Sequence, residues 1–142
     1  MNAGEARERF AQARVARLAT ITPGGRPHLV PIVFALRGDT VYSAVDAKPK
    51  RTLELARLAN VATRPQASVL ADHYEEDWSA LWWVRGDGRA RVLEPGAPEG
   101  EAEAGDAIAR LRERYPQQRV TGAVLALDVA RWSGWAAAGV SR

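Results

Sequence analysis

The sequence of 142 residues contains no cysteine. Disulfide bonds, thiolate nucleophiles, iron–sulfur clusters and cysteine-ligated zinc are therefore excluded. No apolar run approaches the roughly 20 residues that a membrane helix needs, so we expect no association with a membrane. The first twenty residues mix Glu and Arg with apolar positions and contain no apolar signal core. We therefore expect a cytoplasmic protein.

Histidine is nearly absent, since the chain has only His28 and His73. Neither alternates with carboxylates at the spacing of a metal site. Residues 72–77 carry suitable atoms, but we interpret this stretch as a solvated acidic loop. No serine stands in the Gly-x-Ser-x-Gly context of a hydrolase nucleophile. The sequence therefore predicts neither a metal site nor hydrolase chemistry.

The composition is that of a globular protein, with 46% hydrophobic and 26% charged residues. The length fits one domain over residues 1–142 and excludes a disordered tail protein. A chain of this size buries roughly two thirds of its unfolded surface. We therefore expect a single core that needs no metal or disulfide to hold it together.

The positive charge is concentrated in the first half of the chain. Residues 1–70 contain eleven basic and five acidic residues, whereas residues 71–142 contain nine basic and twelve acidic residues. A run of five basic residues, a zinc-finger spacing and an aromatic-basic RNA motif are all missing from the sequence. The basic half therefore indicates a small anionic ligand rather than a nucleic acid.

Lysine occurs at one place only. Eighteen of the twenty basic residues are arginine. The two lysines both occur in the segment Lys48-Pro49-Lys50-Arg51. A compact ammonium is not interchangeable with a planar guanidinium, so the pair suggests a point-charge contact to a phosphate or carboxylate. Chance placement of two lysines on a solvated loop is the alternative.

The hydrophobic pattern predicts a mainly β protein of the α+β class. Pro31 lacks the N–H that a sheet ladder requires, which predicts an edge or a bulge where a ligand reaches the strand. The expected elements, in order, are a helix over 3–13, strands over 15–22, 27–36 and 41–45, a helix over 49–59 that ends near Asn60, a strand over 67–74, a strand-pair region over 81–94 broken at 86–88, a helix over 101–115 and a strand over 123–132.

The predicted helix that begins near Pro49 has cations where a helix usually has acids. Lys50 and Arg51 occupy its first turn, where free backbone N–H groups already carry partial positive charge. Helix N-termini bind phosphate through these N–H groups, and flanking cations strengthen such a site. A solvated helix start that tolerates the repulsion at small cost is the alternative.

Five tryptophans are many for a chain of this length. Trp82 and Trp83 are adjacent in a predicted strand, so their side chains lie on opposite faces. One of them is then available for the core and the other for a ligand or a partner chain. For any single tryptophan, core packing is the simpler interpretation.

The order of these segments resembles the pyridoxamine 5′-phosphate oxidase-like split barrels, and within them the actinobacterial branch that uses the deazaflavin coenzyme F420. The likeness spans nearly the whole chain and ends at Arg131-Trp132-Ser133-Gly134-Trp135, which departs from the ending of true pyridoxamine phosphate oxidases. The segments that carry it are Ala16-Arg17-Leu18-Ala19-Thr20, Gly25-Arg26-Pro27-His28-Leu29-Val30-Pro31, Asp39-Thr40-Val41-Tyr42, Lys48-Pro49-Lys50-Arg51, Asp72-His73-Tyr74-Glu75-Glu76-Asp77-Trp78 and Leu81-Trp82-Trp83-Val84-Arg85.

The resemblance implies a six-stranded antiparallel split β-barrel with flanking helices, of the FMN-binding type. It implies a homodimer with two cofactor sites at the subunit interface. It also implies that basic residues after the third strand hold the cofactor phosphate. By this matching the cofactor-binding residues are Lys48, Lys50, Arg51, Ser43 near the phosphate or ribityl chain, His28 and Pro31 along the ring edge, and Trp82 or Trp135 from the partner.

The function that this resemblance implies is an F420-dependent oxidoreductase that transfers hydride between the coenzyme and a small organic acceptor. The cofactor carries the chemistry, so no side chain is required as an acid or base. An FMN-dependent oxidoreductase of the same superfamily is the enzymatic alternative. A non-catalytic flavin-binding or F420-binding protein and a haem-binding split barrel are the others.

Overall fold

The computed structural model describes residues 1–46, 51–94, 96–118 and 120–137. It contains three α-helices, one short 3₁₀ helix and seven strands within those ranges. In chain order the elements are α1 (Ala3–Gln12), β1 (Ala16–Ile21), β2 (Pro27–Ile32), β3 (Ala35–Arg37), β4 (Thr40–Asp46), α2 (Arg51–Thr63), β5 (Gln66–His73), the 3₁₀ helix (Trp78–Ala80), β6 (Trp82–Leu93), α3 (Glu101–Arg114) and β7 (Val120–Ala136).

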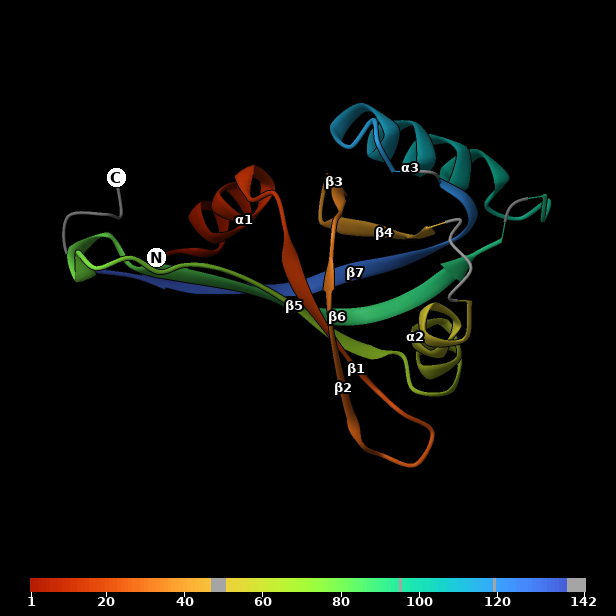
Figure 1. Cartoon of the computed structure of the whole chain (residues 1–142), viewed down its shortest axis with the longest axis horizontal. Coiled ribbons are helices and arrows are strands. Elements are labelled where there is room, and N and C mark those ends of the chain that lie inside the picture. Colours follow the sequence, from red (N-terminus) through yellow and green to blue (C-terminus); the bar gives the residue numbers. More distant parts are fainter. Residues whose placement is uncertain (47–50, 95, 119, 138–142) are drawn as a thin grey trace.

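All seven strands form one sheet in the order β2-β1-β5-β6-β7-β4-β3, and every pairing is antiparallel (Figure 1). The edge strands β2 and β3 are consecutive in the chain and are separated by residues 33 and 34. Three successive Cα–Cα steps span at most about 11 Å. The two edges of the sheet must therefore approach each other at this point, which rolls the sheet toward a barrel.

The prediction of one strand over residues 27–36 was wrong. The chain forms β2, leaves the sheet for Val33 and Phe34, and re-enters at the opposite edge as β3, where it pairs with β4. The first three predicted strands are therefore not a simple meander, and the sheet has seven strands where six were expected. Pro31 lies in β2, so its prediction as an edge residue is confirmed.

Several predicted boundaries also shift. The helix α2 runs past Asn60 to Thr63 and stops before Pro65, while its expected start at Pro49 lies outside the described residues. The strand β6 is continuous through Gly86-Asp87-Gly88, where a break was expected. The reason is that a Cβ on Gly88 would lie 2.0 Å from the backbone oxygen of Asp128, so this glycine permits a close strand approach beside a bulge.

The apolar side chains form two clusters. The first, which we call the barrel core, lies inside the rolled sheet and receives Phe10 from α1 and Val61 from α2. The ring of Phe10 packs 4.4 Å from that of Phe34, at the crossing between the two edges. The second, the α3 core, lies outside β3, β4 and β7 and receives Ala107 and Leu111 from α3. The helix predicted over 101–115 is confirmed.

A network of polar groups joins α3 to the sheet. The guanidinium of Arg91 in β6 donates two hydrogen bonds to Glu103 and two to Asp128, at 2.7 to 3.0 Å. These bonds hold the pKa of both carboxyl groups below their usual range. The buried Tyr42 hydroxyl donates to Glu103, and burial together with this bond raises the pKa of Tyr42 to about 12.

Gly88→Ala should strongly destabilise the protein, because the new methyl group would meet the backbone of β7 rather than a movable side chain. We expect the free energy of unfolding to fall by at least about 2 kcal/mol in urea titrations. Gly105→Ala is the matched control, since a Cβ there meets nothing within 4 Å and the residue lies inside α3. It should raise stability by roughly 0.5 to 1 kcal/mol. Equal effects of the two changes would contradict this account.

The Arg91 network should make stability depend on pH in the acid range. Glu103 and Asp128 have lowered pKa values in the folded protein, so their contribution is fully present above the unfolded pKa values of about 4. It disappears as the pH falls through the folded values. Arg91→Ala should therefore destabilise the protein in urea titrations at pH 7, and by progressively less as the pH is lowered below about 4. An equal loss across this pH range would show that the network contributes only packing.

Candidate functional site

The predicted phosphate-binding segment lies between β4 and α2. Lys48 and Lys50 fall outside the described residues. Of Arg51 the structure describes the backbone, which begins α2. The basic segment therefore stands in the sequence between the end of β4 and the first residue of α2, whose first-turn N–H groups have no partner within the helix.

Ser43 lies in β4, opposite Leu125 of β7. Ser43 is buried, with 3% of its surface exposed. Strand alternation puts it on the same face as Val41, which belongs to the barrel core. The structure thus places Ser43 on the inner side of the barrel wall, three positions before the end of β4.

His28 and Pro31 lie on opposite faces of β2. The exposure pattern of the strand alternates, with His28 partly buried on the inner face and Pro31 exposed on the outer face. His28 stands opposite Thr20 of β1, and its Nδ1 atom is buried without a hydrogen-bond partner among the described residues. A buried polar atom left unpaired is costly, so this nitrogen is a candidate for bonding to a ligand.

The outward face of β2, β1, β5 and the first half of β6 carries none of the described helices, because these bury their apolar residues in the two cores. The register aligns rows of side chains across this face, which we call the open face. Leu29 and Leu70 on it are 67% and 37% exposed. The central row, from β2 to β7, consists of Leu29, Ala19, Ser68, Asp87 and Arg131.

A cavity of about 470 Å³ lies at this central row. Its position follows from the small side chains of Ala19 and Ser68, which leave the face hollow between larger neighbours. The Ser68 hydroxyl donates to the Asp87 carboxylate, which also accepts from Arg85 at 3.0 Å. The other lining residues are Thr20, Ile21, Gly25, Pro27, Gln66, Ala67 and Gly88. The volume and the few polar groups suit a flat organic ligand.

The strands β5, β6 and β7 continue past the beginning of β1 as an arm (Figure 1). On one face of the arm Trp82 packs against the barrel core, with the guanidinium of Arg9 5.2 Å from its ring and His73 stacked at 6.2 Å. On the other face Trp135 stands opposite Trp83 and is 48% exposed. Trp82 is thus packed within the chain, whereas Trp135 is about half exposed to solvent.

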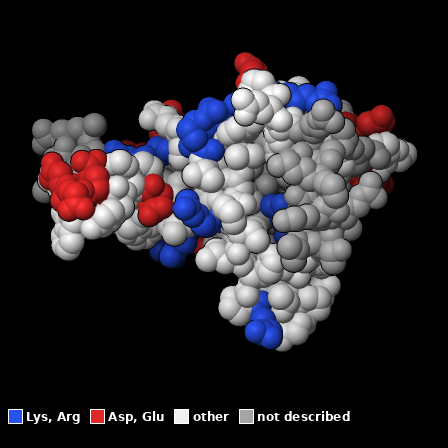
Figure 2. All heavy atoms as spheres, in the orientation of Figure 1, with Lys and Arg blue, Asp and Glu red and all other residues white. Residues whose placement is uncertain are grey.

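The connection between β5 and β6 ends the arm in an acidic tip, visible at one end of the molecule in Figure 2. Glu75, Glu76 and Asp77 are exposed there. Hydrogen bonds from Ser79 hold the pKa of Asp77 below its usual range. The part of the chain that the structure describes contains no group of three or more His, Asp and Glu side chains arranged to hold a metal ion.

Sequence reasoning missed Ala19, Ser68 and Asp87 as neighbours in one cavity. The available signal was the Gly86-Asp87-Gly88 triplet, which we interpreted as a break in the strand. Two glycines around a charged residue inside a strand also mark a close backbone approach, and that interpretation applies here. The pairing of Ala19 with Ser68 depends on the order of the strands, which no local pattern contains.

Comparison with known proteins identifies relatives over almost the whole chain. A family model described as pyridoxamine 5′-phosphate oxidase matches residues 3–136. No curated protein matches the chain. None of the helices in the described residues is long and apolar enough to cross a membrane.

Three solved structures show the same fold. A conserved hypothetical protein of Mycobacterium tuberculosis is 21% identical, with a TM-score of 0.70, and the alignment covers 96% of this chain and 85% of that one. An FAD-binding protein of Mesorhizobium loti is 21% identical, with a TM-score of 0.69 and 94% of each chain covered. A heme-binding protein of Mycobacterium smegmatis is 26% identical, with a TM-score of 0.67, covering 96% of this chain and 55% of that one. The expected split-barrel fold is confirmed.

Proposed function

Because the chain belongs to the pyridoxamine 5′-phosphate oxidase family, we propose that it is an oxidoreductase that binds coenzyme F420 and passes hydride between it and a small organic acceptor. The observation that carries this proposal is the basic segment with the chain's only lysines, placed between β4 and the first turn of α2. F420 carries a phosphate and an acidic tail. A cluster of point charges beside a helix N-terminus matches such a polyanion.

The residues of the open face fit the ring of such a coenzyme. Its cavity is lined mainly by apolar and small groups, and a few polar groups stand at its edge. Ala19, Ile21 and Pro27 would exclude water from the ring, and the Ser68–Asp87 pair would orient it. His28 lies on the inner face of β2 and does not line this cavity, so its unpaired nitrogen is not assigned to the ring. When bound, the deazaflavin supplies the hydride chemistry, and the chain supplies position and a dry surface.

FMN is the second candidate cofactor, because its phosphate and flat ring make the same demands on the basic segment and the cavity. Relatives whose names describe FAD binding favour a flavin in general, and a heme-binding relative keeps a non-catalytic haem protein as a further candidate. Titration of the purified chain with F420, FMN and hemin separates them. Tight FMN binding without F420 binding would overturn the F420 proposal, and a Soret band would favour haem.

We propose that the cofactor phosphate or tail is held by Lys48 and Lys50. The double variant Lys48→Ala, Lys50→Ala should weaken F420 binding by well over tenfold, because each charge-assisted contact contributes roughly 1.5 to 3 kcal/mol. Thermal unfolding should be nearly unchanged, since the two cations repel the helix start. Added salt should reproduce part of the loss.

The matched control is the double variant Arg110→Ala, Arg112→Ala, which removes two positive charges from α3. It should bind F420 as the parent does, because these arginines lie on the helix outside the open face. If the lysine variant binds F420 as tightly as the parent, the proposal is wrong, and the two lysines are a chance pairing on a solvated loop.

We propose that the protein is a homodimer in which the open face is buried. Leu29, Leu70 and Trp135 form an exposed apolar set on one face, and pairing would remove it from water. Leu29→Lys should shift the sedimenting species from dimer to monomer at micromolar concentration and weaken F420 binding with it. Ala109→Lys, at an exposed position of α3, should leave the dimer intact. A parent chain that sediments as a monomer would refute both the dimer and a shared site.

A further inference from the structure

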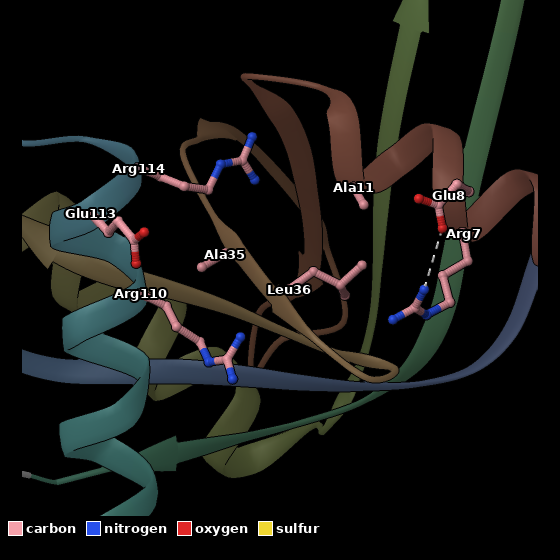
Figure 3. Close-up of a pocket in the computed structure, with 8 residues that line it drawn as sticks. All are labelled: Arg7, Glu8, Ala11, Ala35, Leu36, Arg110, Glu113 and Arg114. Carbon is pink, nitrogen blue, oxygen red and sulfur yellow. Dashed lines mark ion pairs between the residues drawn. The ribbon is translucent and has the colours of Figure 1, made fainter.

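A second cavity lies between α1 and α3, over the short strand β3. Its volume is about 440 Å³. Figure 3 shows Arg110 and Arg114 reaching toward it from α3, Arg7 standing across from them on α1, and Leu36 between the two helices. The cavity at the open face shares no lining residue with it. It is thus separate from the site proposed for the cofactor.

Two of the three arginines have acidic partners at the rim. Arg7 lies 3.3 Å from Asp39 and donates to the backbone oxygen of Gly38. Arg110 donates to Asp106 at 2.8 Å, and this carboxylate is shared with Arg37. Both guanidinium groups are partly exposed and have donors to spare, because a guanidinium carries five N–H groups.

Arg114 is the exception. Its Nη1 and Nη2 atoms donate to the backbone oxygens of Phe34 and Ala13, and its guanidinium lies 4.8 Å from the centre of the Phe34 ring. Among the described residues no carboxylate pairs with it. Burial lowers the pKa of Arg114, and the nearby charge of Arg14 lowers it further. A partly desolvated cation therefore borders the cavity without an anion to balance it.

The remaining lining supports a ligand larger than a single ion. Ala11, Ala35 and Leu36 give an apolar floor, and Glu8 and Glu113 add two carboxylates against the three guanidinium groups. Glu8 is 69% exposed in its side chain and lies 3.9 Å from Arg7. Among the described residues neither glutamate forms an ion pair with Arg114, whose hydrogen bonds go to backbone oxygens. The cavity combines a positively charged wall with an apolar base, which is the pattern of a site for an organic anion.

We propose that this cavity is a second ligand site, which binds a small organic molecule through a phosphate or carboxylate group held by Arg114, Arg110 and Arg7. The guanidinium fork matches the paired oxygens of both groups. A ligand bound there would bridge α1 and α3 across β3. It would thereby stabilise the crossing at Phe34, whose backbone oxygen accepts a hydrogen bond from Arg114 and whose ring packs against Phe10.

Isothermal titration of the parent chain at low ionic strength, with inorganic pyrophosphate and with citrate as the two probes, tests the proposal. Saturable binding of at least one probe is expected, and the probe that binds more tightly names the preferred group. The lysine variant Lys48→Ala, Lys50→Ala should retain this binding, because those residues belong to the proposed cofactor segment. This variant separates the new site from the cofactor site, whether or not F420 is the cofactor.

Arg110→Ala should weaken the probe about ten-fold or more while thermal unfolding without ligand stays near that of the parent. Arg114→Lys keeps the charge and loses the fork, so it should also weaken binding, and it avoids the larger loss of structure expected of alanine there. Arg112→Ala, from the same helix but absent from the cavity lining, is the matched control and should bind as the parent does.

Three results would overturn the proposal. The first is the absence of saturable binding for both probes. The second is parent-like affinity in both Arg110→Ala and Arg114→Lys. The third is binding that the lysine variant abolishes, which would locate the probe at the segment between β4 and α2 instead.

Discussion

The fold depends on the crossing of the chain from one edge of the sheet to the other within two residues. Because β2 and β3 are the two edge strands, Val33 and Phe34 link the ends of the whole sheet. Phe34 is fully buried, and it meets Phe10 of α1 and the guanidinium of Arg114 of α3. Two helices that are far apart in the sequence, α1 and α3, are therefore anchored at the same point. The crossing also joins the two cores, because Phe34 belongs to the barrel core and the next residue, Ala35, belongs to the α3 core.

The closure also decides which surface stays uncovered. With α1 and α2 packed against the barrel core and α3 on the outside of β3, β4 and β7, the open face is left as the apolar surface of the sheet. The side chains that hollow it, Ala19 and Ser68, are small, and Gly88 of β6 lets the neighbouring strand β7 approach closely. A cofactor pocket at a subunit interface, as we propose, would need this combination of an open face and a hollow.

Local patterns predicted the helices and most strands because each has a strong periodic signal. The helix over 101–115, found as α3, is an example, as is Pro31 on an edge. The split of the second strand could not be predicted, since Val33 and Phe34 are good strand residues and only pairing with two different partners interrupts them. Gly88 was misread for the same reason: its role is set by Asp128, forty residues away in the sequence.

In the candidate site, too, local features could be predicted from the sequence and features that depend on the fold could not. The lysine pair could be proposed as a site from charge alone, because the anomaly lies within five adjacent residues, and it stays a proposal. That His28 and Pro31 lie on opposite faces follows from alternation along β2, and the expectation of a shared ring edge did not take it into account. The cavities, by contrast, gather residues from three or four elements each, and no spacing rule connects Arg7 with Arg110 or Ala19 with Ser68.

The prolines of β2 have a consequence for how this protein meets other chains. Pro27, Leu29 and Pro31 occupy alternate positions of an edge strand, and a proline fits a ladder only where its nitrogen points away from the neighbouring strand. Of the three nitrogens that point outward, only that of Leu29 carries a hydrogen. A foreign strand therefore finds one donor where a full ladder needs three, so strand addition and fibril growth are disfavoured at this edge. The apolar surface beside it remains free to associate face to face.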